Sequence, residues 1–85
     1  MTNPTDIQLR ILDTLAMGRG RHAAMAYISL SRPDTVRVFR AGRECTAFGL
    51  ADLDACAAAG WVDFDRRMRR YRITKAGRAK RREER

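Results

Sequence analysis

Residues 60–77 constrain the fold of this chain most, because they contain two alternating patterns on either side of a short basic stretch. Val62 and Phe64 alternate with aspartates, and Tyr71 and Ile73 alternate with arginines. A period of two is typical of half-buried strands. Pairing the two strands puts the four apolar side chains on one face, and two aspartates and two arginines on the other. The sequence therefore predicts a β-hairpin whose apolar face joins the core.

The predicted hairpin has a basic tip, residues 66–69, which reads Arg-Arg-Met-Arg and has no glycine or proline. Two-residue hairpin turns rely on residues that tolerate positive φ, chiefly Gly, Asn and Asp. We therefore expect a longer, mobile loop that projects three cations into solvent.

This segment resembles the wing of the winged helix-turn-helix family of DNA-binding domains. In that family a helix ends at a glycine followed by an apolar pair, a basic hairpin follows, and the second strand continues into Tyr-x-Ile/Leu-Thr-x-x-Gly. The matching residues are Gly60-Trp61-Val62, the arginines at 66, 67, 69 and 70, and Tyr71-Arg72-Ile73-Thr74-Lys75-Ala76-Gly77. The resemblance covers about the last third of the chain. It implies a small α+β winged-helix domain.

The length of 85 residues, 45% of them hydrophobic, predicts a single domain over residues 1–85 with one compact core. Residues 1–4 and 79–85 are expected to be frayed. The predicted order of elements is helix, hairpin (or short helix plus strand), helix, basic hairpin wing and short C-terminal helix capped by Thr74. The shared core is expected to contain Ile11, Leu15, Leu53, Trp61, Phe64 and Ile73.

The first helix is predicted from a capping box, Thr5-Asp6-Ile7-Gln8, followed by apolar residues at helical spacing up to Leu15. Gly18, with Gly20 close behind, marks its expected end. The next segment, residues 21–31, fits either a short helix at 21–28 or a strand. We favour a β-hairpin from about Met25 to Arg40. It would replace the usual second helix of a helix-turn-helix, which departs from the family pattern.

A second long helix is predicted from Thr46, as N-cap, to Ala59, with Gly60 as its stop. Its core stripe consists of Leu50, Leu53, Cys56 and Ala57. The resemblance makes this the recognition helix, yet it has no Arg, Lys, Asn or Gln to read base edges. Its two aspartates, Asp52 and Asp54, would repel phosphates. Its opposite face is small and apolar, so we predict a possible protein or homodimer interface there, formed by Phe48, Ala51, Ala55, Ala58 and Ala59.

Positive charge is concentrated at one end of the chain. Residues 61–85 have eleven Lys and Arg against four Asp and Glu, or +7 of the total +8. A one-ended basic patch on a small domain indicates a polyanionic partner, most often nucleic acid. The expected nucleic-acid contacts are the wing arginines, with three flanking phosphate contacts: Arg66, Arg67, Arg69, Arg70, Arg72, Lys75 and Arg78.

Other function classes find little support. His22 has no Ser, Cys or Asp partner at a recognisable spacing, and no catalytic constellation or phosphate-cradling loop is present, so we expect no enzyme and no cofactor. Two cysteines, Cys45 and Cys56, with one histidine are too few ligands for a structural zinc site, and no metal is expected. No apolar run has the length of a membrane span, and no secretion signal is evident, so a cytoplasmic protein is expected.

The leading hypothesis is a winged-helix protein that binds duplex DNA, of the kind that regulates transcription in bacteria or phages. The alternative is a protein-interaction or toxin-like module, because the order of elements is also similar to the small YjhX-type toxin family. Binding of structured RNA by the same basic hairpin is a third hypothesis.

Overall fold

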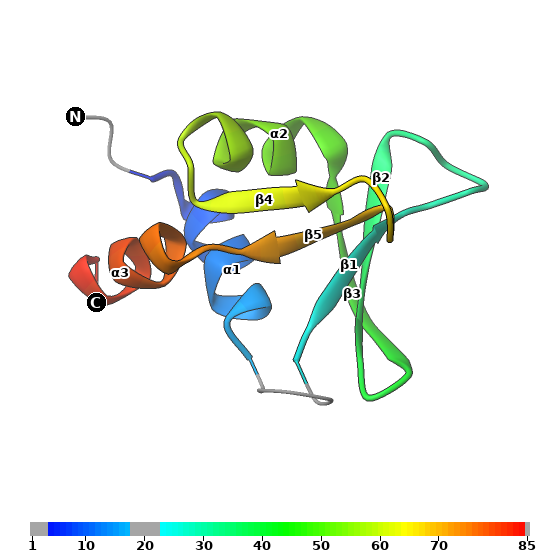
Figure 1. The fold of residues 1–85 in the computed structure, drawn as a ribbon, viewed down its shortest axis with the longest axis horizontal. Helices are drawn as coiled ribbons and strands as arrows, with labels where there is room; N and C mark the ends of the chain where they lie inside the picture. Colours follow the sequence, from blue (N-terminus) through cyan, green and yellow to red (C-terminus); the bar gives the residue numbers. More distant parts are fainter. Residues whose placement is uncertain (1–3, 18–22, 85) are drawn as a thin grey trace.

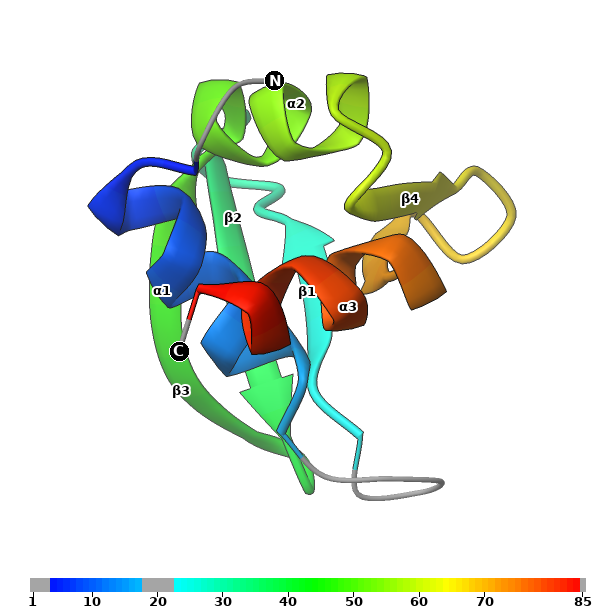
Figure 2. The ribbon, with the colours of Figure 1, turned by 90° about the vertical axis from the view of Figure 1, so that its left-hand side faces the viewer.

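The computed structural model describes residues 4–17 and 23–84. In chain order these residues form α1 (Asp6–Leu15), β1 (Met25–Ile28), β2 (Thr35–Arg40), β3 (Arg43–Gly49), α2 (Leu50–Ala58), β4 (Val62–Asp65), β5 (Arg70–Ile73) and α3 (Lys75–Glu83). The five strands make one antiparallel sheet in the order β3-β2-β1-β5-β4. The three helices lie on one side of it (Figures 1 and 2). The expected α+β class is confirmed, with more strands than predicted.

Some predictions fall on residues outside the described ranges. These are residues 1–3 of the frayed start, Gly18 and Gly20 as the end of the first helix, residues 21–22 of the ambiguous segment, which include His22, and Arg85 at the end of the tail.

Helix α1 begins at the predicted capping box. The Thr5 hydroxyl accepts a hydrogen bond from the Gln8 amide at 3.2 Å, and the Gln8 side chain accepts one from the Thr5 amide at 2.9 Å. These two bonds satisfy amides that the first turn leaves without helical partners. Ile11, Leu12 and Leu15 are buried, so the predicted apolar face packs into the core.

The first hairpin consists of two strands, β1 and β2, within the predicted range of about Met25 to Arg40. Strand β1 pairs with β2 from Met25 opposite Phe39 to Ile28 opposite Val36, which confirms the hairpin rather than a short helix over the described part of the segment. Ala26, Val36 and Val38 are fully buried. The second helix of a helix-turn-helix is therefore absent from the described residues between α1 and α2, and three consecutive strands take its place.

Strand β3 overturns the predicted start of the second helix. Residues 43–49 pair with β2, Thr46 lies opposite Val38 instead of capping a helix, and α2 starts only at Leu50. The two-residue turn before β3 has positive φ at both positions, 53° at Ala41 and 79° at Gly42. Alanine is an unusual residue for the first of these positions, so the turn lacks the usual hairpin signature. Backbone pairing with β2 outweighs the capping preference of Thr46.

The end of α2 and the second hairpin agree with the predictions. Gly60 has a φ of 82°, the Gly60 amide donates to the Ala57 carbonyl at 3.0 Å, and the Trp61 amide donates to the Cys56 carbonyl at 2.9 Å, which is a Schellman motif. Strands β4 and β5 pair with Val62 opposite Ile73 and Phe64 opposite Tyr71. Their apolar side chains face the core as expected.

The core lies between the sheet and the helices. The predicted shared core is confirmed: Ile11, Leu15, Leu53 and Trp61 are buried, and Phe64 and Ile73 pack against them half-buried. Burial of these side chains supplies the main driving force for a chain of this size. In the predicted stripe of α2, Leu53 and Cys56 are fully buried, and Leu50 and Ala57 pack beside them.

The start of α3 is bonded to the start of β4. The Thr74 hydroxyl accepts from the Gly77 amide at 3.0 Å and donates to the Gly60 carbonyl at 2.7 Å, and the Thr74 amide donates to the Trp61 carbonyl at 3.0 Å. A Cβ added to Gly77 would lie 2.0 Å from that same carbonyl oxygen. Glycine is therefore required here by close packing.

Helix α3 extends through Glu83 into the segment that was expected to be frayed. The Arg81 side chain forms an ion pair with Asp13 of α1 at 2.7 Å, and Lys80 lies near Glu83 and Glu84. The side chain of Lys80 is only 12% exposed. The helix therefore packs along α1 instead of being solvated on all sides.

We expect Gly77→Ala to lower the free energy of unfolding by about 1–3 kcal/mol, because the added methyl group meets the Trp61 carbonyl. Urea unfolding followed by circular dichroism measures the change. Ala76→Gly, at the exposed neighbouring position, is the matched control and should cost only the helix propensity difference of about 1 kcal/mol. A Gly77→Ala variant that is more stable than the native chain would contradict this account.

Candidate nucleic-acid interface

The turn between β4 and β5 is shaped by an aspartate. One carboxylate oxygen of Asp65 accepts hydrogen bonds from the Arg67 amide at 3.0 Å and the Met68 amide at 3.3 Å. Arg69 then takes a φ of 53°, a conformation that is usually given to glycine or asparagine. These two bonds fix the path of the turn, so three basic side chains project from a defined backbone.

The turn presents its arginines to solvent. Arg66, Arg67 and Arg69 are exposed, and none of them forms an ion pair with any residue in the described part of the chain. Met68, which lies between them, is 49% exposed. Because no carboxylate has to be displaced, these guanidinium groups are available to phosphate oxygens. We call residues 66–69 the arginine turn.

The other four predicted contacts are spread over the molecule. Arg72 is exposed on β5, and Lys75 is exposed at the start of α3, at the opposite end of the hairpin from the arginine turn. The guanidinium of Arg78 reaches back to the Ala16 carbonyl at 3.5 Å, at the C-terminal end of α1. A cation is favourable there because of the helix dipole. Arg78 therefore has a structural role in addition to any contact with phosphate.

Arg70 lies on the second strand of the hairpin, as the alternation predicts. It is half-buried in β5, where it lies opposite Asp65 of β4 and Tyr27 of β1, apart from the exposed arginines at 66, 67 and 69. One terminal nitrogen of its guanidinium lies 3.3 Å from the Met25 sulfur, and its Nε atom is buried without a hydrogen-bond partner. The structure thus places Arg70 on the outer face of the sheet, the face away from the helices.

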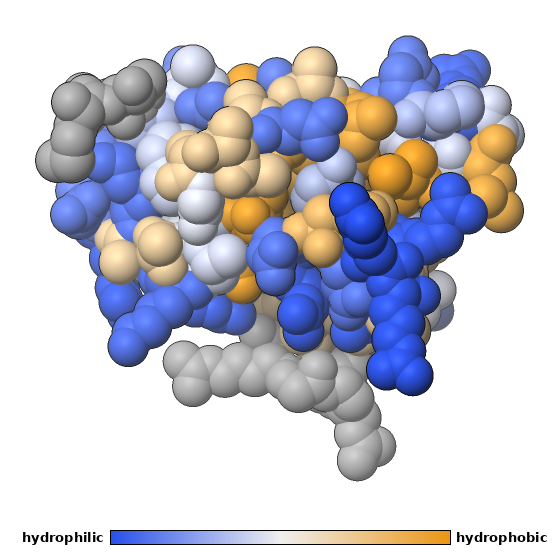
Figure 3. All heavy atoms as spheres, turned by 45° about the horizontal axis from the view of Figure 1, so that its top comes forward, coloured by the Kyte–Doolittle hydropathy of each residue, from blue (hydrophilic) through white to orange (hydrophobic). Residues whose placement is uncertain are grey.

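Helix α2 presents alanines rather than basic groups. Ala51, Ala55, Ala58 and Ala59 are exposed, as the predicted interface requires. Phe48 is a correction: it belongs to β3 and is only 6% exposed, because it faces the core. Figure 3, with the α2 side turned forward, shows apolar surface (orange) beside long hydrophilic side chains (blue).

Asp54 connects α2 to the β4–β5 hairpin. Its carboxylate accepts a hydrogen bond of 2.7 Å from the Tyr71 hydroxyl of β5. Burial, the bond to Asp54 and the charge of Asp54 together raise the pKa of Tyr71 above its usual range. One of the two carboxylates predicted to repel phosphates therefore serves to hold α2 against the hairpin.

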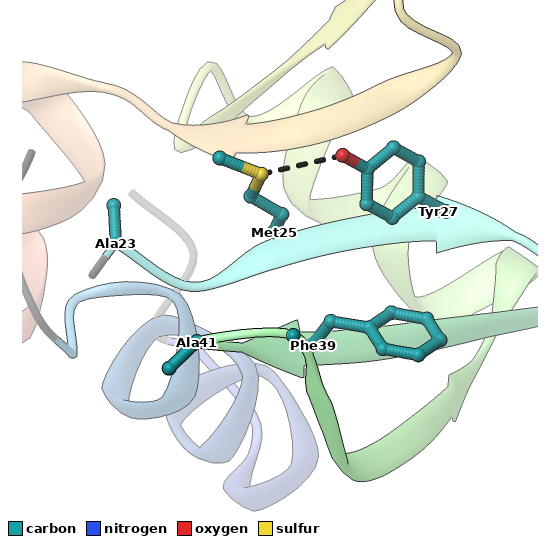
Figure 4. A pocket seen from close by; sticks show the side chains of 6 residues that line it. Ala23, Met25, Tyr27, Phe39 and Ala41 are labelled. Carbon is teal, nitrogen blue, oxygen red and sulfur yellow. Dashed lines mark hydrogen bonds between the residues drawn. The ribbon is translucent and has the colours of Figure 1, made fainter. Parts of the chain in front are cut away.

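Sequence reasoning missed the aromatic group on the outer face of the sheet. Tyr27 and Phe39 lie edge to face with ring centroids 6.1 Å apart, next to a hollow of about 430 Å³ (Figure 4). The alternation of Met25-Ala26-Tyr27-Ile28 is the signal that could have placed Tyr27 on this face. It was ambiguous because alanine and methionine also favour helices.

Chemical sites of other kinds are not seen in the described residues. Within residues 4–17 and 23–84, no three His, Cys, Asp or Glu side chains are grouped so as to hold a metal ion. Among the described helices, none combines the length and the apolar character needed to span a membrane.

Comparison of the chain with models of protein families, with curated proteins and with solved structures finds no match in any of the three. Functional inference therefore depends on the geometry and charge of the surfaces described above.

The two cysteines should differ sharply in reactivity. Cys45 is exposed, whereas Cys56 is fully buried, and burial, with a smaller effect from Asp52, raises the pKa of its thiol from 9.0 to about 11. At pH 8 we expect a thiol reagent to modify one cysteine in the folded chain and two in denaturant. Cys45→Ser should abolish the fast reaction. Fast modification of both thiols in the native protein would contradict the burial of Cys56.

The raised pKa of Cys56 also makes the stability of the fold depend on pH. Because the folded state raises the pKa of Cys56, its contribution to stability is complete below pH 9 and is lost as the pH rises to about 11. Urea unfolding of native and Cys56→Ala chains across this range measures it. The variant should lose less stability than the native chain between the two pH values.

Proposed function

We propose that this protein binds duplex DNA through the arginine turn, whose guanidinium groups contact backbone phosphates. One observation supports the proposal above the others: three exposed arginines, with no ion-pair partner among residues 4–17 and 23–84, lie on a turn that Asp65 holds in shape. A fixed backbone lowers the entropy cost of ordering these side chains on a phosphate backbone.

The distribution of charge supports the same proposal. Residues 61–85 account for +7 of the net +8. Each protein cation that contacts a phosphate releases a condensed counterion from the DNA, and this release makes the binding free energy more favourable. A compact basic element therefore binds DNA tightly without reading its sequence. Arg72 on β5 and Lys75 just after it add to the positive field that steers DNA toward the hairpin.

We further propose that binding is weakly sequence-selective. Phosphate contacts position a protein on DNA but do not read its sequence, which requires side chains in the grooves. Helix α2 offers only alanines and acidic groups on its exposed face, and Asp54 is bonded to Tyr71. A regulator of bacterial or phage type built this way would obtain specificity from a partner or from a second copy.

A protein-interaction module is the second candidate. Exposed alanines at 51, 55, 58 and 59 on α2 would let another helix approach closely. Such a contact could form a dimer that presents two arginine turns to one duplex, which would raise the affinity by multivalency. The toxin-like hypothesis from sequence belongs to this class. DNA binding that does not change when the arginine turn is altered would favour it.

The proposal is tested by reversing the three exposed arginines, Arg66, Arg67 and Arg69, to Glu. We expect loss of detectable binding to a random-sequence duplex in a fluorescence anisotropy assay. For the native chain, the slope of log affinity against log salt should be about −0.9 for each phosphate contacted. Circular dichroism should remain native, since the reversed side chains are exposed.

The matched control reverses three exposed arginines elsewhere, Arg10, Arg40 and Arg43, for the same change in net charge. It should weaken binding far less, because these residues lie on α1 and at the β2–β3 turn. Equal losses in the two triple variants would show that only net charge matters, and native affinity in the arginine-turn variant would refute the proposal.

A further inference from the structure

The outer face of the sheet is not covered by any described helix. All three helices lie on the opposite face, as Figures 1 and 2 show. The outward side chains of the central strands are Met25 and Tyr27 from β1, with Arg37 and Phe39 from β2. Strand β5 adds Arg70 and Arg72. Aromatic and cationic groups thus alternate on a surface that core packing does not use.

Tyr27 lies between two arginines in a row across the sheet. Strand register puts Arg70 of β5 opposite Tyr27 on one side and Arg37 of β2 opposite it on the other. Adjacent strands are about 4.8 Å apart, so the two arginine backbones are roughly 10 Å apart. A cation on each side of an aromatic ring is an arrangement that suits a base with its flanking phosphates.

Met25 connects the arginine to the aromatic pair. Its sulfur accepts the Tyr27 hydroxyl at 3.2 Å and lies 3.3 Å from the guanidinium of Arg70. Thioether sulfur is a weak acceptor, so both polar groups keep much of their capacity for a stronger partner. The buried Nε of Arg70 also has no hydrogen-bond partner among the described residues.

Two hollows flank the aromatic pair, and both are lined by Tyr27 and Phe39. One, of about 430 Å³, also borders Met25 and is shown in Figure 4; the other, of about 330 Å³, borders Ser29, Ser31 and Arg37. Small-molecule sites usually measure about 300–1,000 Å³, so each hollow has room for a planar base. Hydroxyl groups at the second hollow can bond to base edges or to sugar.

We propose that this outer face binds single-stranded nucleic acid, with bases stacked on Tyr27 and Phe39 and phosphates near Arg37, Arg70 and Arg72. Stacking requires bases that are free of pairing, which a duplex does not offer. This site is separate from the arginine turn and does not depend on duplex binding there. The carboxylates on this face, Asp63, Asp65 and Glu44, are on the edge strands. Asp63 and Asp65 lie opposite Arg72 and Arg70, and Glu44 is paired with Arg37, so phosphates compete with them from the open side of the sheet.

Charge favours nucleic acid over a second copy of the chain. Two copies meeting through this face would bring Arg37, Arg70 and Arg72 of each toward those of the other. Like charges brought together at a buried interface cost free energy unless carboxylates interleave. The three carboxylates of this face are on the edge strands β3 and β4, each beside an arginine of its own chain, and the central strands β1, β2 and β5 offer none to a second copy. A polyanion removes the repulsion instead of adding to it.

The test uses labelled mixed-sequence RNA of about twelve nucleotides, within the site sizes known for such surfaces, and DNA of the same sequence. Fluorescence anisotropy should show binding by the native chain. Tyr27→Ala and Phe39→Ala should each weaken it by about 5- to 150-fold, the range expected for one stacked base. The matched control, Tyr27→Phe, keeps the ring and should bind nearly as the native chain does. Tighter binding of the RNA than of the DNA would show that the 2′-hydroxyl is contacted. Equal binding would show that any single strand is sufficient.

Measuring the affinity for duplex DNA distinguishes this site from the arginine turn. Tyr27→Ala should leave affinity for duplex DNA unchanged, so failure of one proposal is visible without failure of the other. Ultraviolet crosslinking of the native chain to the RNA, mapped by mass spectrometry, should label Tyr27 or Phe39 and requires no variant to fold. Native RNA affinity in both alanine variants, or crosslinks confined to other elements, would overturn the proposal. Alanine variants that no longer self-associate in sedimentation but still bind the RNA as the native chain does would also overturn it.

Discussion

The contact between Thr74-Gly77 and Gly60-Trp61 is the constraint on which the hairpin depends. It joins the end of β5 and the start of α3 to the backbone that enters β4, so both ends of the hairpin are fixed at one point. The absence of a side chain at Gly77 permits this approach. Tyr71 adds a second attachment by bonding to Asp54 of α2. With its base fixed in this way, the hairpin can present a turn of exposed arginines.

Short-range signals in the sequence were sufficient for the elements that depend on local chemistry. The capping box at Thr5, the Schellman end at Gly60 and the alternation in 62–65 and 70–73 each predicted what is observed. Strand β3 could not be predicted in this way, because its existence depends on pairing with β2. Thr46 and Phe48 look like helix cap and helix surface until a partner strand is present, and pairing then places Phe48 in the core.

The two candidate sites also differ in whether local sequence signals can predict them. The arginine turn could be predicted from a basic run between two alternating segments, whereas the burial of Arg70 beside Tyr27 and Met25 depends on pairing with β1. The aromatic face combines the β1–β2 hairpin with β5, which is distant in sequence, and only the sheet order brings Tyr27 between Arg37 and Arg70. A local pattern therefore predicted the electrostatic surface, whereas the stacking surface required the tertiary structure.

The proposals place nucleic-acid contacts on the hairpin and the sheet, and none on the exposed face of α2. The most direct measurement is an amide NMR titration of the isotope-labelled chain with a short random-sequence DNA duplex. Shifts that gather at residues 65–70 and leave the exposed positions of α2 unmoved would agree with the account. Shifts centred on Ala51, Ala55 and Ala58, with the arginine turn unmoved, would contradict it.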